Sequence, residues 1–141
     1  MTDAAVLSEV LRRESRSYLQ YVRESYPWAM GRDETKRESV LTIALEENAA
    51  MQEIARAMQK RHMPLPSLGG FPASFTTSNF IAVGFLVPKL IAAQKQGISA
   101  LEASLASVQD VELKNRLHHF LEMKTKHLHD LEALGSTPQA A

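Results

Sequence analysis

Four long stretches of this chain carry apolar residues at alternating spacings of three and four, and that periodicity is the strongest constraint on its fold. Residues at this spacing share one face of an α-helix. No stretch shows the apolar–polar alternation that is typical of a half-buried strand. The pattern predicts helices at about residues 3–26, 33–62, 78–106 and 110–134. With 141 residues, we expect one all-α domain over residues 1–141.

The connections predict how these helices are arranged. The breaks around residues 27–32 and 107–109 are short, so each should join two antiparallel neighbours. The middle connection, residues 63–78, is long enough to reach roughly 50 Å when extended. A helix of 25 residues is only about 38 Å long. We therefore expect two antiparallel helix hairpins joined by a long crossover, with the second and third helices parallel.

Each apolar stripe is interrupted once, near its middle, by a polar residue. The interruptions are Glu14, Glu47, Gln94 and Lys124. Four polar residues at one level of a helical core are costly to bury unless they satisfy one another. They are therefore the leading candidates for a site. The alternative is that Lys124 lies at the edge of the stripe and extends its ammonium to solvent.

The chain also resembles the ferritin-like superfamily, in particular small rubrerythrin-related bacterial proteins. The segments that carry the resemblance are Glu46–Glu47, the crossover GGFPASFTTSNF leading into FLVPKLI, and HLHDLEAL near the end of the last helix. The resemblance implies a ferritin-like four-helix bundle. It also implies a di-iron site with a Glu on each of two helices and Glu-x-x-His on the other two.

Half of the six metal ligands that the resemblance implies are missing. Glu14, Glu47 and His127 match it, whereas Ala50 stands at a histidine position and Gln94 and Lys124 stand at glutamate positions. A lysine ammonium has no lone pair to offer a metal. The expected site is therefore degenerate and holds no metal cofactor, and iron bound through Glu14, Glu47 and His127 is the alternative.

In place of the metal, we expect Lys124 to pair with Glu14 and Glu47, because two close buried carboxylates need a compensating cation. Gln94 and His127 would supply further hydrogen bonds. One excess negative charge remains. A shared proton, a protonated His127 or Arg13 would offset it.

The remaining features bear on function and partners. The 16 basic and 16 acidic residues balance, which gives no reason to expect nucleic-acid binding. No apolar run is long enough for a membrane span, and the N-terminal residues do not resemble a signal peptide, so we expect a cytoplasmic protein that does not bind membranes. Absence of cysteine excludes disulfides and thiolate chemistry. Large aromatic residues in the connections, Trp28, Phe71 and Phe75, cap the helix ends or make contacts, and a homodimer is expected.

Three functions follow from these observations. The first is a non-catalytic scaffold or binding protein whose metal centre has been replaced by a polar cluster. The second is a rubrerythrin-like di-iron oxidoreductase or peroxide scavenger that uses Glu14, Glu47 and His127. The third is a small-molecule binder with a pocket in the core beside Tyr18, Tyr21, Gln94 and Lys124. A cavity that reaches these residues would favour the third function over a sealed core.

Overall fold

The structure is a computed structural model that describes residues 1–31 and 33–136. These residues form five α-helices, one short 3₁₀ helix and no strand, which confirms the all-α prediction. The helices are α1 (Asp3–Ser15), α2 (Tyr18–Ser25), α3 (Asp33–Lys60), α4 (Val83–Ser107) and α5 (Val111–Gly135), with the 3₁₀ helix η1 (Ala73–Ser78) between α3 and α4. No helix among the described residues is long and apolar enough to cross a bilayer.

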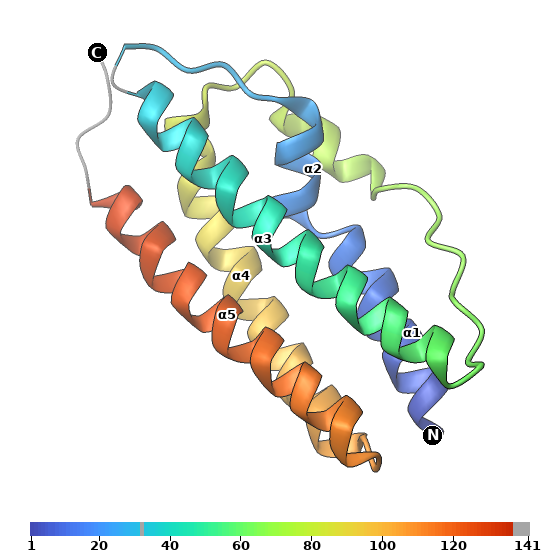
Figure 1. Cartoon of the computed structure of the whole chain (residues 1–141). Helices are drawn as coiled ribbons and strands as arrows, with labels where there is room; N and C mark the ends of the chain where they lie inside the picture. Colours follow the sequence, from blue (N-terminus) through green and yellow to red (C-terminus); the bar gives the residue numbers. More distant parts are fainter. Residues whose placement is uncertain (32, 137–141) are drawn as a thin grey trace.

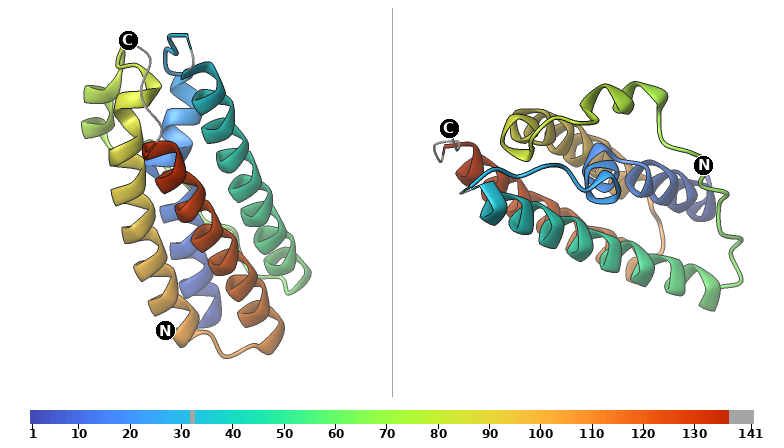
Figure 2. Two further views of the ribbon diagram at one scale, coloured as in Figure 1. Left: turned by 90° about the vertical axis from the view of Figure 1, so that its left-hand side faces the viewer. Right: turned by 90° about the horizontal axis from the view of Figure 1, so that it is seen from above.

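The helices run alongside one another in two antiparallel pairs (Figure 1). The α1–α2 segment is antiparallel to α3, and α4 is antiparallel to α5, which packs against both α3 and α4. The connection after α3 returns along the outside of the helices, so α4 runs in the same direction as α3 (Figures 1 and 2). The long connection therefore runs from one end of the helices to the other, as its length in the sequence predicted.

The first predicted helix is broken in two. Residues 3–26 were expected to be continuous, but α1 ends at Ser15 and α2 begins at Tyr18. The Ser17 hydroxyl caps α2 by accepting the backbone N–H of Gln20, so a local serine bond replaces the helical backbone pattern. At the other end of α2, Tyr26 adopts left-handed backbone angles with φ 47°.

The third predicted helix starts later than expected. Ser78 is not its N-cap, because it ends η1, and α4 begins five residues further on, at Val83. Phe80, expected to open the apolar stripe of this helix, lies in the connection with φ 67° and is 83% exposed. Pro88 falls in the second turn of α4. The second helix ends at Lys60, slightly before the predicted residue 62, and α5 lies within one residue of its predicted bounds.

Two apolar clusters fill the core, one toward each end of the helices. The first includes Leu7, Leu11, Met58, Leu117 and Phe120, and the second includes Leu19, Val40, Leu86, Leu90 and Leu131. On each of α3, α4 and α5, buried polar residues separate the two clusters in sequence, and Glu14 follows the last member of the first cluster on α1. The fold therefore contains a polar layer between two apolar ones.

Candidate functional site

Lys124 of α5 lies at the centre of the polar layer. Its side chain is only 2% exposed, and Nζ lies 2.7 Å from Glu14 Oε1 and 2.9 Å from Glu47 Oε1. Both carboxylates are equally buried. The ammonium thus bridges α1, α3 and α5 and does not extend to solvent, which removes the alternative raised by its position in the sequence.

The remaining polar residues complete the hydrogen bonding of Glu47. Gln94 Nε2 of α4 donates to Glu47 Oε2 at 2.7 Å and to the Lys124 backbone carbonyl at 3.0 Å. His127 Nδ1 lies 2.8 Å from the same Glu47 oxygen. Since a carboxylate only accepts, the proton of this bond belongs to Nδ1. Glu14, Glu47, Gln94, Lys124 and His127 therefore form one connected group, which we call the central cluster.

The electrostatics of the central cluster favour its charged form. Burial by itself would raise the pKa of Glu47, but the His127 hydrogen bond, the Lys124 charge and the Gln94 hydrogen bond together bring that pKa below its ordinary value. Burial would likewise lower the pKa of Lys124, and the two carboxylates, Glu14 first, raise it above its ordinary value. A carboxylate and an ammonium that hold each other ionised make a stable buried pair, and they make Lys124 a poor nucleophile at neutral pH.

Two further charged side chains approach the central cluster from its rim. Arg13 Nε lies 3.6 Å from Glu14 Oε2, and Glu46 Oε1 lies 3.4 Å from His127 Nε2. Arg13 was one of the groups expected to offset the excess negative charge, and it lies where it can do so. With Arg13 included, the buried carboxylates Glu14 and Glu47 face two cations.

A glycine that was not singled out from the sequence makes room for the central cluster. A Cβ added to Gly97 of α4 would lie 3.2 Å from Lys124 Cε and 3.4 Å from Glu14 Oε2. The signal was present in the sequence, because Gly97 lies three residues after Gln94 and so shares its helix face. Its small size allows the long lysine side chain to reach both carboxylates.

These residues do not fit a pair of iron ions. The ammonium of Lys124 occupies the space between the two carboxylates, and it repels a cation and offers it no lone pair. Ala50 supplies no ligand at the place of the second histidine. Among the described residues, no group of three or more His, Cys, Asp or Glu side chains has an arrangement suited to a metal ion.

A groove of about 370 Å³ reaches the central cluster from the surface between the α1–α2 segment and α4. Glu14, Gln94 and Lys124 lie in its wall together with Gly97, and Tyr18 and Phe75 contribute aromatic rings. The Tyr18 hydroxyl forms a hydrogen bond with the Ser78 hydroxyl, which holds its ring against the connection. We call this cavity the central groove.

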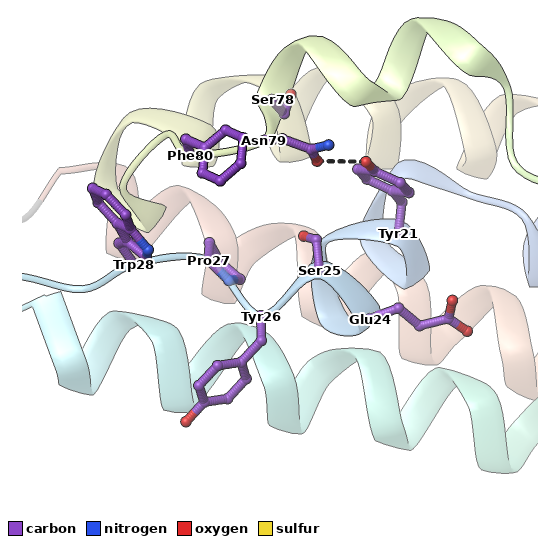
Figure 3. Close-up of a pocket in the computed structure, with 9 residues that line it drawn as sticks. All are labelled: Tyr21, Glu24, Ser25, Tyr26, Pro27, Trp28, Ser78, Asn79 and Phe80. Carbon is purple, nitrogen blue, oxygen red and sulfur yellow. Dashed lines mark hydrogen bonds between the residues drawn. The ribbon is translucent and has the colours of Figure 1, made fainter.

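Tyr21 does not line the central groove, although the sequence placed it beside Tyr18. It lies in a second cavity of about 400 Å³, where the α2–α3 link passes the segment between η1 and α4 (Figure 3). Trp28 and Phe80 also line this second cavity, which we call the end pocket. It could not be predicted from the sequence, because its residues come from α2 and the link after it and from residues 78–80, which are far apart along the chain.

The histidines other than His127 do not approach the central cluster. His118 and His129 are 58% and 74% exposed and face acidic residues of their own helix. His62 follows α3 with φ 57°. Function therefore has to be inferred from the central cluster and the two cavities. No protein-family model matches this sequence, and no curated protein or solved structure is significantly similar to it.

Proposed function

We propose that the protein is a non-catalytic binding protein built as a ferritin-like four-helix bundle that needs no metal. In this bundle the α1–α2 segment forms one helix and α3, α4 and α5 form the others. Two antiparallel pairs joined by a long crossing connection support the assignment, because that connectivity distinguishes ferritin-like bundles from simple up-and-down ones.

The observation that carries the proposal is the position of the Lys124 ammonium between Glu14 and Glu47. A single lysine there supplies positive charge that a metal ion would otherwise supply to the two carboxylates. Iron-dependent oxidation or peroxide scavenging would need ligands in place of this cation. The central cluster is then a structural element, and we assign the binding function to the central groove beside it.

Elemental analysis of the purified protein, before and after aerobic incubation with ferrous iron, tests the first part of the proposal. We expect less than about a tenth of an equivalent of iron per chain, and no gain in the Lys124→Glu variant. About two iron ions per chain would overturn the proposal and make a di-iron oxidoreductase the leading function.

The central groove favours a small organic anion as the bound molecule. Its lining includes Arg13, Arg16 and Lys124. Since Glu14 and Glu47 already pair with Lys124, the two arginines are the cations that can face a ligand. Arg13 Nε and Nη2 are buried without hydrogen-bond partners, since the 3.6 Å contact with Glu14 is too long for a hydrogen bond. Buried donors of this kind favour a ligand that brings acceptor oxygens. The rings of Tyr18 and Phe75 would contact its apolar part.

Binding of octanoate and of 1-octanol, followed by calorimetry and by NMR shifts of groove residues, tests this second part. We expect octanoate to bind more tightly than the alcohol, and Arg13→Gln to weaken it about tenfold by removing the unpartnered donors. Arg12→Gln is the matched control, because Arg12 is exposed and bonds to the Ser67 carbonyl instead. If neither compound shifts groove residues, the groove is not a binding site.

A further inference from the structure

The end pocket is bounded by two connections that the fold ties together. The α2–α3 link supplies Trp28, and the segment before α4 supplies Phe80 (Figure 3). The backbone N–H of Val83 donates to the Trp28 carbonyl at 2.7 Å, which holds the two segments side by side. A cavity between tied segments keeps its shape and does not depend on an open loop.

The far wall of the end pocket is also fixed. Figure 3 shows Tyr21 across the cavity from Trp28 and Phe80. The Tyr21 hydroxyl donates to Asn79 Oδ1 at 2.5 Å, and its ring packs against Phe71 with centroids 5.3 Å apart. Three aromatic rings from three parts of the chain thus surround one space of about 400 Å³.

Two of these rings are in positions that packing of the chain does not explain. Trp28 is 62% exposed and Phe80 is 83% exposed, and the two rings contact each other, edge to face, with centroids 6.5 Å apart. Phe80 is also held with φ 67°, a left-handed conformation that is unfavourable for a residue other than glycine. Strain of this kind is often found at binding sites.

The charge of the end pocket is opposite to that of the central groove. Among its nine lining residues, all of which the structure describes, Glu24 alone is charged at neutral pH. Its side chain is 53% exposed, and its ion pair with Arg23 Nη2 is long, at 3.9 Å. The carboxylate is therefore loosely held. It gives the end pocket a negative net charge, although its side chain points away from Trp28 and Phe80 (Figure 3).

We propose that the end pocket binds a small organic cation of the quaternary ammonium type. The faces of Trp28, Phe80 and Tyr21 would attract its methylated ammonium group, because aromatic faces carry negative electrostatic potential. Glu24, the one charged lining residue, would attract the cation electrostatically without touching it. This site is separate from the central groove in its residues and in the sign of its charge, so it does not depend on the function proposed above.

Trp28 reports directly on the end pocket, because it is the one tryptophan of the chain. The experiment titrates the full-length protein with choline and, separately, with 3,3-dimethyl-1-butanol, which has the same shape but no charge. Intrinsic fluorescence is the readout. We expect a saturable change with choline, and binding of the neutral alcohol weaker by about fivefold or more, since only the charged compound gains the cation–π attraction.

The Glu24→Gln variant separates a cation site from an apolar pocket. We expect it to weaken choline binding about twofold at low salt, because it removes a long-range attraction and keeps the shape of the side chain. Glu102→Gln on the exposed side of α4 is the matched control and should change nothing. Both side chains are exposed, and circular dichroism checks that both variants fold.

Three results would overturn the proposal. The first is equal binding of choline and the neutral alcohol, which would make the end pocket merely apolar. The second is no saturable fluorescence change with choline in the intact protein. The third is a Trp28 emission that depends on protein concentration together with a dimer in sedimentation, which would mean that a second copy of the chain covers the pocket. None of these results bears on octanoate binding in the central groove.

Discussion

The central cluster buries charged residues and the end pocket exposes aromatic ones, so both depart from the usual distribution of residues. Only in the central cluster do other residues of the chain satisfy the unusual groups. In the middle of the helices, Lys124 and Glu47 are buried, yet each is paired and hydrogen-bonded. At the end, Trp28 and Phe80 are exposed and one of them is strained, and the chain supplies little in return. Buried charges that are paired within the chain stabilise the fold, whereas exposed aromatic rings without such partners indicate a ligand.

The largest expected effect comes from breaking the compensation in the central cluster. Lys124→Met leaves Glu14 and Glu47 buried without their cation. Removing one partner of a buried ion pair typically costs about 3–5 kcal/mol of unfolding free energy. Urea denaturation followed by circular dichroism would measure this loss.

A triple variant provides the control for that loss. With Glu14→Gln and Glu47→Gln added to Lys124→Met, no buried carboxylate remains unpaired, and most of the lost stability should return. If Lys124→Met alone is more stable than the parent, with the same pH dependence, the ion pairs do not hold the core and our interpretation of the central cluster is wrong.

The second-largest expected effect is a loss of unfolding free energy in acid, when Glu47 becomes protonated. Since the pKa of Glu47 in the folded chain lies below its ordinary value of 4.5, its charge contributes stability that is present above about pH 4.5. That contribution is lost as the pH falls through the lowered pKa. The pKa of Lys124 lies above 10.5, so its contribution is present below that pH and is lost only when the pH rises through the raised pKa.

Urea midpoints measured between pH 3 and pH 7 would follow this loss of stability in acid, which we call the acid limb. We expect a fall in stability smaller than that caused by deleting Lys124, because a protonated Glu47 still forms hydrogen bonds. Glu47→Gln should flatten this limb, whereas Glu102→Gln should leave it unchanged, since Glu102 is exposed. If the Glu47→Gln variant loses as much stability in acid as the parent, other carboxylates cause the loss.

Gly97→Ala tests how tightly the central cluster is packed. Alanine favours a helix over glycine by about 1 kcal/mol, but its Cβ would press on Lys124 Cε at 3.2 Å and Nζ at 3.3 Å. Because two carboxylates hold that ammonium, Lys124 has little freedom to move. We expect a net loss of about 1 kcal/mol.

Gly70→Ala is the matched control for this substitution. An added Cβ at Gly70 meets nothing within 4 Å, so the variant should be neutral or slightly more stable. Thermal unfolding of both variants would measure the difference. A stabilising Gly97→Ala would mean that Lys124 moves easily, and that the polar layer is looser than its distances indicate.

Four of the five members of the central cluster were evident from the sequence because each of them interrupts a long apolar stripe. Glu14, Glu47, Gln94 and Lys124 share a level because helical periodicity is regular over many turns, so an error of one residue in a helix boundary does not move them. His127 follows Lys124 by one turn and is buried with it. Lys124 is the only cation among these four residues, so Glu14 and Glu47 were its expected partners.

Features that depend on a few backbone angles were not predictable in the same way. The break at Ser17 and the late start of α4 arise from local caps that compete with a continuing helix. Phe80 fits the apolar stripe by its spacing, yet its φ of 67° places it outside the helix. The end pocket joins residues of α2 and the link after it to residues 78–80, and neither periodicity nor charge in the sequence brings those segments together.

The smallest expected effect is a gain in stability, and it tests the end pocket. Phe80→Asn should raise the free energy of unfolding by about 0.5 kcal/mol, because asparagine tolerates the left-handed conformation better than phenylalanine does. The ring is 83% exposed, so its removal sacrifices little packing beyond the edge contact with Trp28. Phe85→Asn is the matched control: Phe85 is also exposed, at 62%, but lies within α4, where asparagine brings no gain.

The same Phe80→Asn variant should bind choline less tightly, since one of the three ring faces is gone. A gain in stability together with a loss of binding would mean that the chain keeps a strained phenylalanine for the ligand rather than for the fold. A loss of both would instead show that Phe80 supports the connection before α4, and the contrast with the central cluster would then disappear. Urea unfolding and choline titration of this one variant therefore decide whether the two regions differ in kind.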